Sequence, residues 1–398
     1  MSVRINSILP GYLSSNGGPS FVCYHLLNAM HDAGHDISLY CVTGDNNIHK
    51  PFQHLSMPLW AKPFGYKLFS QETWASYTEW RYRHALKQQD IAYIWNSTSI
   101  ETYKAVKAAG HIILTENVNT HQATSKRILD DEYRRLGLTP NHGIDMESIA
   151  HENAQLELVD YVFSPSREVT KSLLSADIPA EKIIQTSYGL GEHEILAPQD
   201  IFRRAKQKEL TAIFVGRIGI RKGVHLLLEY WAKAGIKGKL KLVGRIEPSA
   251  KHLIEPYLSR PDIEHIPFTH DLRSVYLDAD IFLFPSLEEG SPLVTYLALG
   301  AGLASIVSTM GGDGIIQHGK EGLIIDAHHA DAWIESIRKI FTDTEYRLNI
   351  SNNAYNKSRE YLWDNVGRQR IASLQDLLTN TRIPNPGEIS HVRIADVE

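Results

Sequence analysis

Cysteine is scarce in this 398-residue sequence, and long apolar runs are missing. Cys23 and Cys41 lie in apolar periodic segments without metal-ligand spacing, which argues against a disulfide framework and a zinc site. The first residues contain neither a basic segment followed by an apolar core nor a cleavage site, and no run reaches the length of a membrane span. We therefore expect a cytoplasmic protein with reduced core thiols, neither secreted nor membrane-spanning.

An excess of positive charge is also missing. The chain has 41 Lys and Arg against 46 Asp and Glu, a formal net charge of -5, and no long basic run, which argues against nucleic acid as a partner. Its length exceeds what one hydrophobic core usually supports, so we expect two domains with a cleft between them.

Short apolar runs alternate with amphipathic stretches along the whole chain, which predicts an α/β fold with parallel sheets and crossover helices. Strands at 3–10 and 36–43 should enclose a helix at 19–33 that Gly34 ends. Further strands are expected at 90–95, 111–116 and 161–166, and helices at 70–89 and 146–159. The segment 187–200, with two glycines and a proline, interrupts the alternation. After it the pattern predicts strands at 210–217, 240–245, 263–268, 280–286 and 304–309.

Two stretches of the second half carry charged groups where a strand should end. FVGRIGIRKG (214–223) places Arg217 and Lys222 in a glycine-rich loop, where two cations suit a diphosphate. Alone, a pair of solvated loop charges explains them equally well. FPSLEEGSPL (284–293) places Glu289 in a turn before a helix, where an α/β protein would hold a charged ligand.

Eight segments, in order, resemble the retaining glycosyltransferases of the GT-B fold, specifically glycosyltransferase family four. They are GG (17–18), GHD (34–36), FSPS (163–166), YGLG (188–191), FVGRIGIRKG (214–223), LVG (242–244), DADIFLFPSLEEGSPL (278–293) and GGDGIIQHGKEGLII (311–325). The resemblance implies two facing Rossmann-like domains. Residues 1–190 would form the acceptor domain, completed by a crossover helix within 363–398, and residues 191–362 the nucleotide-sugar donor domain.

The resemblance also implies the roles of individual residues. Glu289 would bind donor-sugar hydroxyls, although a helix-capping carboxylate is the alternative, and Arg217 and Lys222 would stabilise the leaving diphosphate. The expected donor-binding residues are Gly18, Gly216, Arg217, Lys222, Gly244, Glu289, Gly290, Ser291, Leu293 and Val294.

One position departs from the family pattern. The second glutamate of the motif, which reads the ribose hydroxyls, falls on Leu297, and starting the register from Glu288 gives Tyr296 instead. The helix PLVTYLALGAG (292–302) contains no acid. Ribose recognition must therefore be looser, supplied elsewhere, or lost.

The first half offers two further candidates. Gly17 and Gly18 precede a helix, where backbone amides could approach the diphosphate or the acceptor, and a simple strand-to-helix turn is the alternative. His121 matches the histidine that a family subgroup carries beside the reacting sugar carbon. Packing at the surface or in the core is its alternative.

We expect neither a metal nor another cofactor. The acidic pair in Asp278–Asp280 resembles the metal-binding motif of the other major glycosyltransferase fold, but it leads into an apolar strand and is better explained structurally. The donor itself would be a substrate, with a UDP-sugar favoured over a GDP-sugar.

The segment 59–87 interleaves eight aromatic residues with five cations. Such a surface could rest on a membrane that carries a lipid-linked acceptor. Aromatic residues at helical spacing are more often core, and we weight the core alternative more heavily.

The sequence therefore predicts an enzyme that moves a hexose-type sugar from a nucleoside diphosphate to a hydroxyl acceptor with retention and without metal, in bacterial polysaccharide or glycoconjugate assembly. His121, Glu289, Arg217 and Lys222 are its expected catalytic residues. The alternative is a catalytically weakened homologue that binds a sugar or a partner protein.

Overall fold

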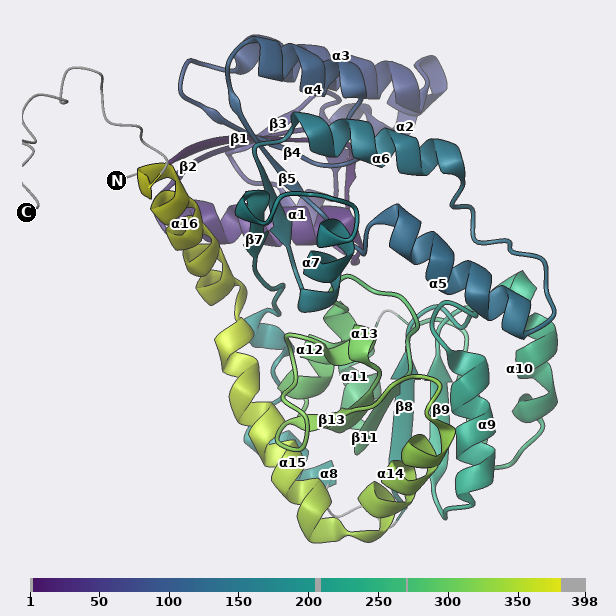
Figure 1. Cartoon of the computed structure of the whole chain (residues 1–398). Coiled ribbons are helices and arrows are strands. Elements are labelled where there is room, and N and C mark those ends of the chain that lie inside the picture. The colour runs from purple at the N-terminus through teal and green to yellow at the C-terminus, as the bar shows by residue number, and fades with distance from the viewer. Residues whose placement is uncertain (1–2, 205–208, 270, 381–398) are drawn as a thin grey trace, which may run out of the picture.

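The computed structural model describes residues 3–204, 209–269 and 271–380. Within these residues the chain forms two parallel sheets, one above the other in Figure 1. The first contains seven strands in the order β3-β2-β1-β4-β5-β6-β7. Its strands are β1 (Arg4–Leu13), β2 (Asp36–Gly44), β3 (Gln53–Leu55), β4 (Ile91–Ile94), β5 (Ile112–Glu116), β6 (Tyr161–Ser164) and β7 (Ile183–Gln185).

The second sheet contains six described strands in the order β10-β9-β8-β11-β12-β13. They are β8 (Thr211–Val215), β9 (Lys239–Val243), β10 (Ile263–Ile266), β11 (Ile281–Phe284), β12 (Ala304–Val307) and β13 (Gly322–Ile324). In each sheet the direction of strand addition reverses once, between β1 and β4 and between β8 and β11. Such reversals place ligands at the carboxyl ends of the strands.

Helices cover both sheets (Figure 1). Those of the first half are α1 (Pro19–Asp32), α2 (Lys62–Leu68), α3 (Gln71–Ala85), α4 (Ile100–Ala108), α5 (Gln122–Arg135), α6 (Met146–Leu158) and α7 (Arg167–Leu174). Those of the second half are α8 (Pro198–Arg204), α9 (Val224–Ala234), α10 (Lys251–Leu258), α11 (Leu272–Leu277), α12 (Leu293–Gly300), α13 (Thr309–Gly312), α14 (Ala330–Thr342) and α15 (Thr344–Ser358), followed by α16 (Trp363–Asn380).

The first sheet is buried on both faces. The side chains of a strand alternate between the two faces, and each face packs into a hydrophobic cluster. Ile5 and Leu9 of β1 belong to the core cluster that includes α1, whereas Ile8 belongs to a separate cluster with Tyr82 of α3. A strand buried on both faces reads as a continuous apolar run. This explains why the sequence around β1 predicts a strand without showing polar alternation.

The chain passes between the sheets twice, and the two passages lie side by side. Leu190 forms a parallel bridge with Leu362, and the Leu190 amide donates to the Tyr361 carbonyl at 2.9 Å. α16 then packs against α1. Its Arg370 is buried and donates to both oxygens of the Glu116 carboxylate, at 2.8 and 3.1 Å.

All the strands and helices expected by residue range are present. The sequence missed β3, β7 and β13, which have three residues each and lie at sheet edges, too short for a periodic pattern. The domain boundaries at 190/191 and 362/363 stay a prediction, and residues 381–398 of the predicted first domain lie outside the described residues.

The core alternative for segment 59–87 is wrong for most of its aromatic side chains. Among the described residues the structure exposes six of the eight, namely Trp60, Phe64, Tyr66, Phe69, Tyr77 and Trp80. Tyr82 is buried, and Trp74 is half-buried. α2 and α3 therefore present an aromatic outer surface. α3 lies over the first sheet on the side away from the second sheet (Figure 1).

In the part of the chain that the structure describes, no helix is both long and apolar enough to cross a membrane. Cys23 and Cys41 are free thiols buried in the first core, in agreement with the structural role expected for them.

Candidate active site

A cavity of about 720 Å³ lies between the two sheets. The first domain contributes the turn after β1 and the start of α1. The second contributes the loops after β8, β9 and β10 together with α12, so the cavity lies at carboxyl ends of strands. Six of the expected donor-binding residues line it: Gly18, Gly216, Arg217, Gly244, Leu293 and Val294. Arginine side chains and backbone from the second domain make this wall suitable for an anionic ligand.

Glycine is required where the loops after β8 and β9 meet. Gly216 and Gly244 have φ of 144° and 146°, and a Cβ on Gly244 would lie 1.8 Å from the Gly216 carbonyl oxygen. The two loops can therefore run side by side only if Gly244 lacks a side chain. Their close approach presents backbone instead of side chains to that part of the cavity.

The sequence reasoning missed two arginines of the lining, Arg245 and Arg273. Arg217 is 74% exposed and lies 3.6 Å from Glu247, and Arg245 lies over the Phe268 ring at 5.3 Å. Arg273 donates to the His193 carbonyl at 3.0 Å. A signal for Arg245 was present, because β8 and β9 both end in Val-Gly-Arg-Ile, at 215–218 and 243–246.

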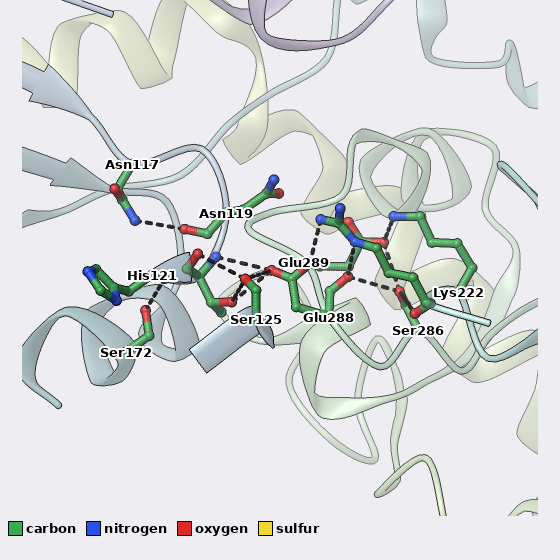
Figure 2. A network of polar contacts seen from close by, with 11 residues as sticks. Asn117, Asn119, His121, Ser125, Ser172, Lys222, Ser286, Glu288 and Glu289 are labelled. Carbon is green, nitrogen blue, oxygen red and sulfur yellow. Dashed lines mark hydrogen bonds and ion pairs between the residues drawn. The ribbon is translucent and has the colours of Figure 1, made fainter. Parts of the chain in front are cut away.

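Lys222 and Glu289 lie next to the cavity but not on its described lining. They form an ion pair with each other, and the Ser286 hydroxyl donates to Glu289 at 2.9 Å (Figure 2). The pair joins the loops after β8 and β11, two neighbouring strands. The capping alternative for Glu289 does not match this geometry, because α12 has Pro292 at its N-cap without a side-chain bond.

Glu288, one residue earlier, faces the first domain. Its carboxylate is fully buried, pairs with Arg221, and accepts from the Thr120 hydroxyl at 2.7 Å and from the Ser125 hydroxyl at 3.1 Å (Figure 2). A Cβ on Gly290 would lie 1.8 Å from the Val118 carbonyl oxygen. The turn after β11 therefore packs directly against the loop after β5.

The His121 ring is buried in the first domain and points away from Glu288 and Glu289 in Figure 2. Nε2 lies 2.8 Å from Asn153 Oδ1 and 3.3 Å from Glu152 Oε2, both on α6. Nδ1 accepts from the Ala123 amide at 3.2 Å, which makes His121 the N-cap of α5. The described lining of the cavity does not include His121, so its catalytic role stays a prediction.

Leu297 contacts both the protein interior and the cavity. Its side chain is half-buried, packs against the large core cluster that also contains Leu299, and lines the cavity together with Val294. A leucine thus faces the cavity where the family pattern has a carboxylate. Ser291 lies off the described lining, and its hydroxyl is 2.7 Å from the Tyr296 hydroxyl.

The remaining sequence candidates have local roles. Gly17 and Gly18 have φ of 96° and 80°, precede α1 and line the cavity. Asp278 is the C-cap of α11, and the Asp280 carboxylate accepts from the Thr211 amide at 3.0 Å, which joins β11 to β8. These contacts agree with the structural explanation of the acidic pair.

A second polar contact joins the domains at the end of α5. Glu132 is buried, and its carboxylate lies 2.8 Å from His225 Nε2 of α9 and 3.1 Å from His328 Nε2. Burial raises the pKa of Glu132, but the hydrogen bonds and charges of the two histidines outweigh it and lower the pKa to about 2.

Comparison with known proteins decides what this architecture is. Residues 198–357 match the family described as glycosyl transferases group 1. Sucrose-phosphate synthase from Thermosynechococcus elongatus superposes with a TM-score of 0.71 at 18% identity, over 95% of this chain and all of the other. This chain has the GT-B fold of glycosyltransferases. The GT-B fold expected from the eight motifs is confirmed, whereas the retaining mechanism stays a prediction.

Other GT-B proteins agree with this assignment. HepE from Anabaena, solved with UDP-glucose, superposes with a TM-score of 0.67 at 13% identity, over 94% of this GT-B chain and 100% of HepE. D-inositol 3-phosphate glycosyltransferase from Corynebacterium urealyticum is 25% identical over 42% of the chain and 43% of its own length. A glycosyltransferase from Methanocaldococcus jannaschii is 27% identical over 43% of the chain and 46% of its own length. The matches thus span less than half the length of these two relatives.

Proposed function

We propose that the protein is a retaining glycosyltransferase that moves a hexose-type sugar from a UDP-sugar to a hydroxyl acceptor, without metal. The setting would be bacterial polysaccharide or glycoconjugate assembly at the cytoplasmic face of the membrane. The observation that carries the proposal is the cavity of the GT-B fold. Its lining from the second domain includes Arg217, Gly216 and Gly244, and the Lys222–Glu289 pair lies next to it. HepE, with the same fold, binds UDP and UDP-glucose, which supports a UDP-sugar donor.

In the proposed step the bond between the sugar C1 and the diphosphate oxygen breaks, and the acceptor oxygen bonds to C1 from the same face. The acceptor proton passes to the departing diphosphate oxygen. Arg217 and Lys222 stabilise the charge that develops on the diphosphate. Glu289 then orients the sugar hydroxyls, for which donor binding must draw Lys222 away from its present pairing with Glu289.

Same-face attack is favoured over a covalent intermediate. A covalent route needs a carboxylate free to attack C1. The two carboxylates on the described lining are Glu194, which accepts from the Gly191 amide at 2.5 Å, and Asp271, which caps α11. Glu288 is held by Arg221 and Thr120. These contacts occupy the candidate nucleophiles.

Thermal stabilisation by a panel of nucleotide sugars tests the donor. A donor at ~100 times its dissociation constant should add about 2.7 kcal/mol of stability. Transfer or hydrolysis of the selected donor should release the nucleoside diphosphate, and NMR of the product should show the anomeric configuration of the donor. A product of inverted configuration, or activity that chelators abolish and added metal restores, would contradict the retaining or the metal-free part.

Membrane contact through 59–87 belongs to the same proposal. Seven of the thirteen large exposed apolar side chains among the described residues lie between Trp60 and Trp80, with Trp60 80% and Phe64 61% exposed. The segment carries five cations and two carboxylates, of which Glu79 is buried, although the chain as a whole is negative. Aromatic side chains beside cations suit an anionic bilayer surface.

Co-sedimentation with phosphatidylcholine vesicles, with and without phosphatidylglycerol, tests this contact. Wild type should bind the anionic vesicles, Trp60→Ser/Phe64→Ser should bind much less, and Leu348→Ser, an exposed leucine of α15, should bind as wild type. Equal binding by all three proteins would remove the surface from the proposal. Self-association of wild type without vesicles would show that this surface binds a second copy of the chain instead of a membrane.

A catalytically weakened homologue is the second candidate, and Leu297 favours it because it places an apolar side chain on the cavity wall. Such a protein would bind the nucleotide sugar without turning it over. Release of UDP from the donor selected by thermal stabilisation separates the two candidates.

A further inference from the structure

A second cavity, of about 600 Å³, lies at the carboxyl ends of β1 and β2 and at the start of α2. Its polar lining consists of Ser15, Asn16, Asp45, Asn46, Asn47 and Lys62. We call it the polar recess. Ser15 and Asn16 also line the cavity between the domains, so the two spaces adjoin. A ligand in the polar recess can therefore extend toward a donor in the larger cavity.

The two charged side chains of the polar recess are held in place. Asp45 accepts from the Ser15 amide and hydroxyl, both at 2.8 Å, and from the Tyr12 hydroxyl at 2.5 Å. The Tyr12 bond, with those of Ser15, lowers the pKa of Asp45. Lys62 Nζ donates to the Gly44 carbonyl at 2.7 Å and lies 3.3 Å from Asn46 Oδ1. One fixed negative and one fixed positive charge leave the polar recess without a net charge.

The asparagines determine the chemistry that such a site can recognise. Asn16, Asn46 and Asn47 are exposed, and each amide offers both donors and acceptors. A sugar hydroxyl also donates and accepts, so amides and a carboxylate match the vicinal hydroxyls of a saccharide. A phosphate offers mainly acceptors at neutral pH, and its negative charge would be repelled by the Asp45 carboxylate. This composition therefore favours a neutral saccharide over an anion.

We propose that the polar recess binds the saccharide part of the acceptor, with Asn46 and Asn47 as specificity contacts. The proposal rests on the proposed function, since it assumes that the adjoining cavity holds the donor. Leu59 and Pro63 complete the lining and lead into α2, whose Phe64 and Leu68 are exposed. An apolar group attached to the bound saccharide would leave the polar recess along this aromatic surface.

Saturation-transfer NMR with methyl α-D-glucopyranoside, methyl α-D-mannopyranoside and octyl β-D-glucopyranoside, each in the presence of UDP, tests the proposal. Wild type should bind at least one glycoside, with the octyl glycoside binding more tightly than its methyl counterpart. Asn46→Ala/Asn47→Ala should weaken that binding by about tenfold, because two sets of hydrogen bonds are lost. The matched control Asn352→Ala, an exposed asparagine of α15, should bind as wild type.

Labelling provides a second measurement. The native thiols Cys23 and Cys41 are buried, so a methanethiosulfonate reagent should modify Asn47→Cys selectively, and the modified protein should lose glycoside binding. Glycoside binding that survives both the double substitution and the modification would overturn the proposal, as would the absence of binding by wild type. Inorganic phosphate binding that Lys62→Ala abolishes would reassign the polar recess to an anion. UDP affinity, measured by calorimetry, tests the proposed function separately.

Discussion

The two walls of the central cavity are built in different ways. The wall from the second domain consists of three loops that follow neighbouring strands, where Gly216 and Gly244 bring backbone together and Arg217 projects from it. The wall from the first domain is formed mainly by the turn Ser15–Gly18, which continues into the amides and carboxylate of the polar recess. The first arrangement suits phosphates and the second suits hydroxyl groups. Substitutions on the two walls should therefore change different measurements.

The largest effect should come from two cations of the second domain, Arg217 on the lining and Lys222 beside it. Lys222→Ala and Arg217→Ala should each lower turnover on the order of 100-fold and weaken UDP binding, because each removes a contact to the leaving diphosphate. Steady-state kinetics and calorimetry with UDP measure the two effects. Lys233→Ala on α9, whose partner is Glu229, is the matched control. Near-normal activity in both variants would remove these cations from the site.

A contact between the domains, off the described lining of the cavity, should affect stability instead. Glu132→Gln should lower the free energy of unfolding by about 2 kcal/mol at pH 5.5. This is less than the free energy that corresponds to the full lowering of the Glu132 pKa, because solvent reaches His328 and screens its charge. The pKa of Glu132 is lowered to about 2, so its contribution is complete above about pH 4.5 and is lost as the pH falls toward 2.

Urea unfolding between pH 3 and 5.5 measures this dependence. The difference between wild type and Glu132→Gln should shrink as the pH falls. Glu229→Gln, which removes a surface pair on α9, should change stability by less than about 1 kcal/mol. A difference that stays constant with pH would show that the ionised carboxylate is not what stabilises the contact.

Leu297→Glu should add ribose recognition to the wall from the second domain. The new carboxylate can accept ribose hydroxyls, so UDP should bind about tenfold more tightly, with discrimination against 2′-deoxy-UDP that wild type lacks. Calorimetry with both nucleotides measures this. Leu272→Glu, also on the lining, should not discriminate between them. A lower melting temperature without a gain in affinity would mean that packing against the core dominates at Leu297.

The smallest effect concerns His121 in the first domain. His121→Ala should cost about 1 kcal/mol, because α5 loses its N-cap, and should leave UDP affinity intact. His121→Asn keeps a capping side chain and should restore the melting temperature. Turnover that falls in both variants would support the predicted catalytic role, whereas turnover restored by Asn would leave only the cap.

The two walls also differ in how far sequence could predict them. Glycines and cations after a strand form a recognisable local pattern, so the sequence singled out Gly216, Arg217 and Gly244. The structure places all three on the lining, and their role in donor binding stays a prediction. Asp45 and Lys62 are 17 positions apart and meet only through the packing of α2 against the end of β2, which leaves no pattern. Glu288 and Glu289 are neighbours of the same type, and only the fold directs one to Thr120 and the other to Lys222.

The paired passages at Leu190 and Leu362 have a mechanical consequence. They tie the domains together on one side of the molecule, near the junction of α15 and α16, whereas Glu132 meets α9 on the other side (Figure 1). The passages act as a pivot and the Glu132 contact as a latch. Because the latch lies far from the pivot, a small rotation of the domains about the passages would separate Glu132 from His225. Such a rotation would break a proton-sensitive contact that lies on the described lining of neither cavity.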